Sequence, residues 1–230
     1  MKHEEEFIKM FNDFTRSRDW HSAFRDFTEM TACAMHQSPY HSGILKRDSA
    51  FEKIEKDYLD IVGKYKRDEL DILCNLFAIT KMALIEKPHD FLGGVYQKLE
   101  MNNKHNGEFF TPIHISELMA KMLFNNPEKE IQEKGYIEIC EPCCGSGVML
   151  IAAANTIFES GFNPIKTMVF HATDINRICF NMCYIQMSLL GIAGKVIHGD
   201  TIRNEIWETR LTPNVMVRAE EAKENGENHA

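Results

Sequence analysis

The 230-residue sequence contains no apolar stretch of the 18 or so residues that are needed to cross a bilayer. It also lacks an export signal at its start, because the opening letters MKHEEEF are acidic and polar. Nor is there a basic surplus, since 26 Lys and Arg residues stand against 34 Asp and Glu residues, a formal net charge of −8. We therefore expect a cytoplasmic protein with no membrane partner. A chain that holds DNA by itself is disfavoured, because phosphate contacts require cationic groups.

The seven cysteines lack the even number and regular spacing of a disulfide framework. Without an export signal, the thiols are expected to be reduced. A zinc site is disfavoured because CEPC (140–143) is a single Cys-x-x-Cys pair, and the second pair of a structural site is missing. Cys179 and Cys183 fall on one helix face, where cysteine serves as a small apolar residue. We predict no metal.

Two kinds of hydrophobic period divide the chain. Residues 4 to about 100 carry apolar residues at helical spacing, with Phe7, Phe11 and Phe14 in the first stripe. From Tyr136 onward, short bulky runs (YIEIC, TMVFHATD and KVIHGD) alternate with helical segments. Strands that alternate with helices predict an α/β fold with a parallel sheet and right-handed crossovers.

This division predicts three parts. A helical bundle occupies residues 1–105, an α/β domain follows over 106–217, and the acidic segment 218–230 is expected to be disordered because it has almost no apolar content. A fourth strand is expected at NVMV (214–217).

The turn after the first expected strand lies in the segment YIEICEPCCGSGVMLIAAANTIF (136–158). Gly145 and Gly147 let the chain reverse tightly and bring its backbone against a ligand. The helix that follows offers unpaired N–H groups and a partial positive charge. In an open parallel sheet, ligands bind beyond the carboxyl ends of the strands, and this turn is expected at such an end.

Two ligand classes use a turn of this kind. The dinucleotide fingerprint G-x-G-x-x-G fails here because Leu150 stands at the third glycine position, which disfavours a nicotinamide oxidoreductase. The spacing acidic-x-x-x-G-x-G is met by Glu141, Gly145 and Gly147. It resembles the spacing of S-adenosylmethionine (SAM) binders, in which the acidic residue lies near the cationic amino-acid end of the ligand.

Acidic residues end the next two expected strands as well. Asp174 stands where a carboxylate can accept from both ribose hydroxyls, and Asp200 where it can accept from an adenine amino group. One such acid would be explained as a solvated residue at a strand end. Three acids at three successive strand ends favour a nucleoside ligand.

Five sequence blocks resemble, in order, the N6-adenine DNA methyltransferases, and specifically the methylation subunits of type I restriction-modification systems. The blocks are DFLGGVYQKL, NGEFFTPIHISELMAKML, EPCCGSG, TDINRICFNMCYIQMSLLGI and HGDTI, from about residue 90 to 201. In the third block, Glu141 replaces the Asp of the family. The resemblance implies a Rossmann-like methyltransferase sheet, SAM as the cofactor and DNA as a partner.

The resemblance also implies the residues of the cofactor site. They come from the segment that closes the methionine side, from the glycine turn and from the ends of the second and third strands. They are Phe110, Thr111, Pro112, Glu141, Pro142, Cys144, Gly145, Ser146, Gly147, Asp174, Ile175 and Asp200. No catalytic residue is assigned.

The base-holding motif of the family, N-P-P-[FY], is missing where it is expected, beyond Asp200. Its asparagine side chain and proline carbonyl would hold the flipped adenine. The pairs Asn163–Pro164 and Asn126–Pro127 come too early in the chain to serve. We therefore expect a sheet truncated before that motif and a SAM-binding chain that is incomplete for catalysis alone.

Two functions follow from that expectation. If the chain is active, it is a SAM-dependent, site-specific adenine-N6 DNA methyltransferase that contacts DNA through a partner subunit, in a homo- or hetero-oligomer. The alternative is a non-catalytic partner that regulates a DNA methyltransferase, because an open strand edge ordinarily needs covering.

Overall fold

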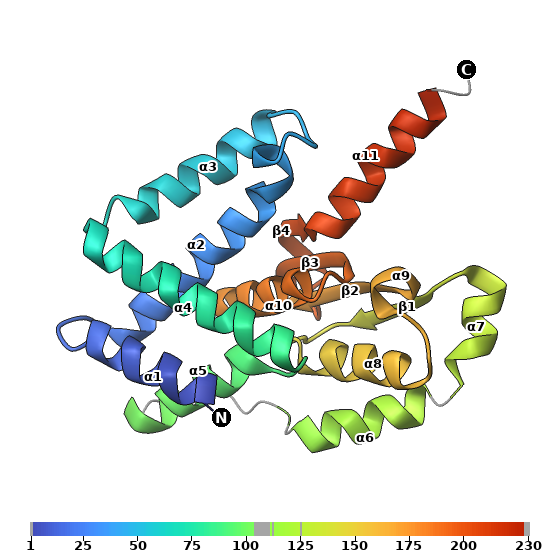
Figure 1. The fold of residues 1–230 in the computed structure, drawn as a ribbon, viewed down its shortest axis with the longest axis horizontal. Helices are drawn as coiled ribbons and strands as arrows, with labels where there is room; N and C mark the ends of the chain where they lie inside the picture. Colours follow the sequence, from blue (N-terminus) through green and yellow to red (C-terminus); the bar gives the residue numbers. More distant parts are fainter. Residues whose placement is uncertain (1, 104–110, 112, 125, 228–230) are drawn as a thin grey trace.

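The computed structural model describes residues 2–103, 111, 113–124 and 126–227 of the chain. Helices precede the sheet region (Figure 1). They are α1 (Lys2–Phe14), α2 (Trp20–His41), α3 (Ser49–Val62), α4 (Arg67–Glu86), α5 (Phe91–Asn103), α6 (Ile113–Leu123) and α7 (Pro127–Lys134). The sheet region consists of β1 (Ile137–Glu141), α8 (Val148–Glu159), α9 (Pro164–Thr167), β2 (Met168–Asp174), α10 (Arg177–Leu189), β3 (Ala193–Asp200), β4 (Glu205–Leu211) and α11 (Pro213–Glu227).

The phenylalanine stripe of α1 lies in the core of the helical region. Phe7 and Phe11 are fully buried, as the helical spacing of the sequence predicted. Their rings meet those of Phe27 and Phe24 on α2 edge to face, with centroids 5.5 and 5.7 Å apart. Such aromatic pairs stabilise a core beyond their buried area, by about 0.5–1.5 kcal/mol each.

The strands form one sheet in the order β1-β2-β3-β4. β1 pairs with β2 and β2 with β3 in parallel, which confirms the three parallel strands expected from the sequence. The register sets Glu141 opposite Ala172 and Asp174 opposite His198. The carboxyl ends of these strands therefore lie side by side at one edge of the sheet.

The predicted fourth strand was wrong. Residues 214–217 lie in α11, and the observed β4 is Glu205–Leu211, which pairs with β3 in an antiparallel direction. Its sequence EIWETRL carries three charged residues, so it lacks the apolar run that is typical of a buried strand. One of them, Arg210, is only 1% exposed.

The predicted disorder of the C-terminal segment was also wrong for residues 218–227. These residues continue α11, which extends away from the sheet (Figure 1). The segment is poor in apolar residues, but the Ala, Glu, Lys and Arg residues in it are strong helix formers. Residues 228–230 lie outside the described part of the chain.

The two faces of the sheet differ in their exposure. Phe170, Ala172 and Val196 are fully buried on the face that α8 and α10 cover. On the opposite face, His171 is half-buried and Cys140 is exposed. Parallel sheets ordinarily have both faces covered, so the second face is unusual within the described residues.

The helical region and the sheet share one hydrophobic cluster. They are also joined by a charge network around Glu29 of α2, which accepts from Arg177 of α10 and from Arg210 of β4, both at 2.6 Å. Burial alone would raise the pKa of Glu29, but the hydrogen bond from Arg177 and the charges of both arginines lower it to about 2. The network therefore fixes α2 against both α10 and β4. The boundary proposed near residue 105 stays a prediction.

In the part of the chain that the structure describes, no helix combines the length and the apolar character that a bilayer crossing requires.

Candidate functional site

The turn between β1 and α8 adopts a backbone conformation that favours glycine. Gly145 has a φ of 53° and Gly147, the N-cap of α8, has a φ of 98°. A Cβ added at Gly147 would lie 3.2 Å from the Sγ atom of Cys183 on α10. Both the left-handed backbone and the close approach of α10 therefore favour glycine at position 147.

Backbone hydrogen bonds fix this turn against the end of β2. The N–H of Cys144 donates to the carbonyl of Thr173 at 2.9 Å, and the N–H of Gly147 donates to the carbonyl of Cys144 at 2.8 Å. The N–H of Gly145 donates to Oδ2 of Asp174 at 2.8 Å. The turn and the second strand end are therefore one unit.

Asp174 organises the edge of the sheet. Besides the N–H of Gly145, the N–H of Asn176, the N-cap residue of α10, donates to Asp174 through the Oδ1 atom at 2.8 Å. A carboxylate has about four acceptor positions, so these two bonds are compatible with further bonds from hydroxyl groups. The sequence predicts a role for Asp174 toward a ligand, and the structure adds a role in shaping the turn.

Glu141 ends β1 next to Asp174. Burial raises the pKa of the Glu141 carboxyl, the N–H of Cys143 at 3.3 Å lowers it, and the negative charge of Asp174 raises it further. Two carboxylates thus lie close together at neighbouring strand tips. Their repulsion would be relieved by a cationic group placed between them.

The third strand tip is tied to the same turn. Oδ1 of Asp200 accepts from the N–H groups of Ile202 and Arg203 at 2.9 and 3.1 Å, and Oγ of Thr201 donates to the carbonyl of Pro142 at 2.6 Å. The structure therefore brings Glu141, Asp174 and Asp200 to one edge.

Ile175 lies at the same edge with an exposed side chain. It is 58% exposed, directly after Asp174, and its carbonyl lies 3.2 Å from Nε2 of His198. An apolar side chain in this position offers a surface against which a planar ring can pack.

Two of the turn residues named from sequence point into the protein. Cys144 is 4% exposed, and its thiol pKa is raised by a hydrogen bond with Cys183 and by burial. Ser146 is fully buried, and its Oγ donates to Oδ2 of Asp90 at 2.6 Å. Either residue could reach a ligand through its backbone, with its side chain serving as support.

Asp90 and Gln186 support the turn and were not identified from the sequence as site residues. Nε2 of Gln186 donates to Oδ1 of Asp90 at 2.9 Å and to the carbonyl of Ser146 at 2.8 Å. Burial raises the pKa of the Asp90 carboxyl, and the bonds from Gln186, Ser146 and Gly93 oppose that shift. Asp90 begins the family-like block DFLGGVYQKL, which could have indicated a role near the site, whereas no feature of the sequence around Gln186 indicated one.

Of the segment expected to close the methionine side, the structure describes Thr111 alone. Thr111 is exposed. Phe110 and Pro112 lie outside the described residues, so their predicted roles stay predictions.

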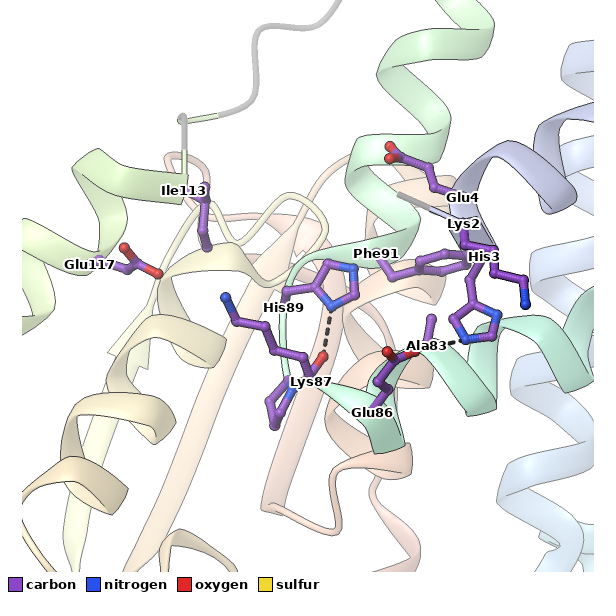
Figure 2. Close-up of a pocket in the computed structure, with 11 residues that line it drawn as sticks. Lys2, His3, Glu4, Ala83, Glu86, Lys87, His89, Phe91, Ile113 and Glu117 are labelled. Atoms are coloured by element: carbon purple, nitrogen blue, oxygen red, sulfur yellow. Dashed lines mark hydrogen bonds and ion pairs between the residues drawn. The ribbon is translucent and has the colours of Figure 1, made fainter.

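A groove of about 420 Å³ lies elsewhere, between the start of α1, the end of α4 and α6 (Figure 2). Two hydrogen bonds join groups that line it: Nε2 of His3 lies 2.9 Å from Oε2 of Glu86, and Nδ1 of His89 lies 2.7 Å from the carbonyl of Lys87. Within the described ranges, no cluster of three or more His, Cys, Asp or Glu residues could hold a metal ion. We assign no ligand to this groove.

A glycine turn follows the first of three parallel strands, and an acidic residue ends each of the three. The chain is therefore an α/β protein whose turn and acids lie at the carboxyl edge of the sheet, where ligands bind in open parallel sheets. The N-6 DNA Methylase family matches residues 87–220, which is more than half of the chain. The chain belongs to this family, as its sequence blocks predicted.

Curated relatives are methylase subunits of type I restriction enzymes. The MpnII subunit of Mycoplasma pneumoniae is 28% identical over 123 residues, 52% of this chain and 21% of its own length. The MjaVII subunit of Methanocaldococcus jannaschii is 24% identical over 160 residues, 66% of this chain and 26% of its own length. The chain thus spans about a fifth to a quarter of the length of these relatives.

Two solved structures are also similar. A putative class I SAM-dependent methyltransferase from Listeria monocytogenes has a TM-score of 0.42 and 18% identity, covering 81% of this chain and 56% of that protein. The methyltransferase subunit of a type I restriction-modification system from Streptococcus thermophilus has a TM-score of 0.46 and 13% identity, covering 90% and 59%.

Proposed function

We propose that the chain binds SAM at the carboxyl edge of its sheet and is the SAM-binding part of an N6-adenine DNA methyltransferase. The observation that carries this proposal is the turn with two positive-φ glycines, bonded to Asp174 and lying beside the raised-pKa carboxyl of Glu141. SAM fits because it combines a cationic amino-acid end with a ribose and an adenine. Membership of the N-6 DNA Methylase family supports the same ligand.

Each strand tip has a proposed role toward one part of SAM. Glu141 would attract the cationic amino-acid end, since no cationic side chain is among the described groups that shift the pKa of its carboxyl. Asp174 would accept from the ribose hydroxyls in charge-assisted hydrogen bonds. Asp200 would accept from the adenine amino group, and Ile175 would pack against the adenine ring.

The remaining contacts would come from the backbone. The turn from Pro142 to Gly147 would present its N–H groups to the methionine part, at the partly positive N-terminus of α8. Thr111, with Phe110 and Pro112, would close that side. SAM supplies the methyl group, and these residues bind it, orient it and exclude water from it.

The groups that hold the target base are proposed to lie outside residues 1–230. Transfer to adenine N6 requires side chains that hold a flipped base, and no N-P-P-[FY] sequence occurs in this chain. The net charge of −8 is also unfavourable for holding DNA. We therefore propose that further polypeptide, such as a partner subunit, contributes the DNA contacts.

Calorimetric titration with SAM tests the cofactor site. We expect heat of binding from the wild type and about tenfold weaker binding by Asp174→Asn, because an amide cannot accept from two hydroxyls as a carboxylate does. Asp48→Asn is the matched control, since Asp48 caps α3 through the N–H groups of Ala50 and Phe51, outside the turn. No heat from the wild type, or unchanged affinity in Asp174→Asn, would contradict the proposal.

Transfer of radiolabelled methyl groups from SAM to DNA tests the catalytic part. We expect no transfer by the chain alone and transfer after addition of the products of neighbouring genes. Transfer by the chain alone would show that this chain itself supplies the base-holding groups.

A second function, association with a methyltransferase as a non-catalytic partner, is favoured by β1. Within the described residues β1 pairs with β2 alone, so its outer edge ends the sheet. Exposed strand edges ordinarily pair with something or are protected. Slower amide exchange in β1 on addition of the partner, without SAM binding by the chain, would favour this function over the first.

A further inference from the structure

We propose that Asp90 is a positioning residue for the glycine turn, acting from the start of α5 through Ser146 and with Gln186. The inference rests on the proposed function, because it assigns to Asp90 the task of holding the SAM-binding turn in its binding conformation. It also makes a claim about the turn itself, which can be measured without ligand.

The carboxylate of Asp90 lies among three donors from three segments. Oγ of Ser146 donates to Oδ2 at 2.6 Å. The N–H of Gly93 and Nε2 of Gln186 donate to Oδ1 at 3.1 and 2.9 Å. Asp90 therefore joins α5, the turn and α10 at one point.

Gln186 makes a second link to Ser146, through the backbone of that residue. Its Nε2 also donates to the Ser146 carbonyl at 2.8 Å, and its Oε1 accepts from the N–H of Leu92 at 3.0 Å. Ser146 and Gln186 are both fully buried, so water cannot replace these bonds without a rearrangement. The side chain and the backbone of Ser146 are thus both fixed from outside the turn.

The turn needs such an external hold because of its own composition. Ser146 stands between Gly145 and Gly147, and glycine populates positive and negative φ with similar ease. The local sequence therefore restricts the turn weakly. Bonds that fix the single residue between the two glycines restrict both flanking backbone angles at once.

The approach of α5 to the turn depends on a glycine of its own. A Cβ added at Gly93 would lie 2.2 Å from Oδ2 of Asp90 and 2.5 Å from Oγ of Ser146. A Cβ added at the neighbouring Gly94 would meet only the flexible carboxylate of Glu4, at 3.1 Å. Gly93→Ala and Gly94→Ala are therefore a matched pair on one helical turn.

The first experiment measures amide hydrogen exchange in the ligand-free protein. The informative N–H groups are those of Gly145 and Gly147, which donate to Asp174 and Cys144. We expect Asp90→Asn and Ser146→Ala to speed their exchange about tenfold, the equivalent of one lost hydrogen bond to a charged group. Asp48→Asn removes the charge of a helix N-cap remote from the turn and should leave these rates unchanged.

The second experiment is a double-mutant cycle on SAM affinity. Asp90→Asn and Ser146→Ala should each weaken binding about tenfold, and the double variant should be no weaker than either one, because both remove the same link. Gly93→Ala should also weaken binding, whereas Gly94→Ala and Asp48→Asn should bind as the wild type does. If Asp90 only capped α5, Asp90→Asn would behave like Asp48→Asn, because asparagine caps a helix about as well as aspartate, and SAM affinity would be unchanged.

The outcomes separate this inference from the proposed function. If the wild type binds SAM and the Asp90 and Ser146 variants bind equally well, the inference fails and the proposed function stands. If the wild type does not bind SAM but the exchange rates respond as expected, the SAM site fails and the hold of Asp90 on the turn stands. Unchanged exchange in both variants overturns the inference whatever the ligand.

Discussion

Glu29 and Glu141 are both glutamates withdrawn from solvent, yet their pKa values move in opposite directions. Glu29 joins α2 to the sheet, and although burial opposes the shift, two arginines lower its pKa to about 2. Glu141 ends β1, where burial and the nearby Asp174 raise its pKa. Among the described residues, no cationic side chain counts among the groups that shift the pKa of Glu141.

The difference separates a structural charge from one suited to a ligand. The charge of Glu29 is neutralised within the protein, so the chain loses stability when that charge is removed. The charge of Glu141 costs stability in the empty protein and would be neutralised by a cation from outside. Opposite shifts at two similar side chains thus distinguish two roles that the sequence alone cannot tell apart.

The largest expected effect is a loss of stability on neutralising Glu29, the glutamate with the structural charge. Glu29→Gln should lower the free energy of unfolding by about 3 kcal/mol, because the buried Arg210 would then share the single carboxylate of Glu208 with Arg177. Urea unfolding measures the loss, with Glu52→Gln on the exposed side of α3 as the control. Since the folded pKa of Glu29 is below its ordinary value of 4.5, its contribution is full above pH 4.5 and is lost as the pH falls toward 2. Equal stability of the two variants would refute the network's role.

A smaller loss of stability is expected at the turn. Gly147→Ala places a Cβ on a backbone with φ of 98° and 3.2 Å from Cys183, which should cost about 1–2 kcal/mol and weaken SAM binding at least tenfold. Gly161→Ala is the matched control, because its φ is 90° but no atom lies within 4 Å of the added Cβ. Thermal unfolding and calorimetric titration together should show strain in both variants and lost binding only in Gly147→Ala.

The change in stability expected on neutralising Glu141 is opposite in sign to that expected at Glu29. Glu141→Gln should slightly stabilise the ligand-free protein at neutral pH, because a raised folded pKa means that ionisation opposes folding as the pH rises through it. The same variant should bind SAM about tenfold more weakly. In the wild type, SAM affinity should fall as the pH drops through the raised pKa of Glu141, and the variant should lack this component. A loss of stability in Glu141→Gln would remove the contrast with Glu29.

The smallest effect is expected at the third strand tip. Asp200→Asn keeps a carbonyl oxygen that can accept from Ile202 and Arg203, so the local turn should persist. SAM affinity should fall about threefold. Titration with an analogue whose adenine amino group is replaced by oxygen sharpens the test. The wild type should discriminate against this analogue more strongly than the variant does.

Local sequence patterns predicted the parts of the fold that depend on local rules. The change of hydrophobic period located β1, β2 and β3, and the glycines located the turn. β4 was missed because Arg210 is buried against Glu29, a residue 181 positions away. The hydrogen bond between Asp90 and Gln186 joins residues 96 positions apart, and the sequence near either residue does not indicate its partner. Polar contacts between residues far apart in the chain were therefore the part of the fold and of the site that could not be predicted from the sequence.

The irregularity of pairing at His198 and Gly199 has an optical consequence. It sets the ring of Trp207 against His198, with centroids 4.9 Å apart, and Trp207 is 51% exposed. The second tryptophan, Trp20, is 7% exposed in the helical core. Because His198 lies against the carbonyl of Ile175, the more exposed indole should change its emission when a molecule occupies the strand tips. With the buried indole as an internal reference, Trp207 is expected to report occupancy of the strand tips through its fluorescence.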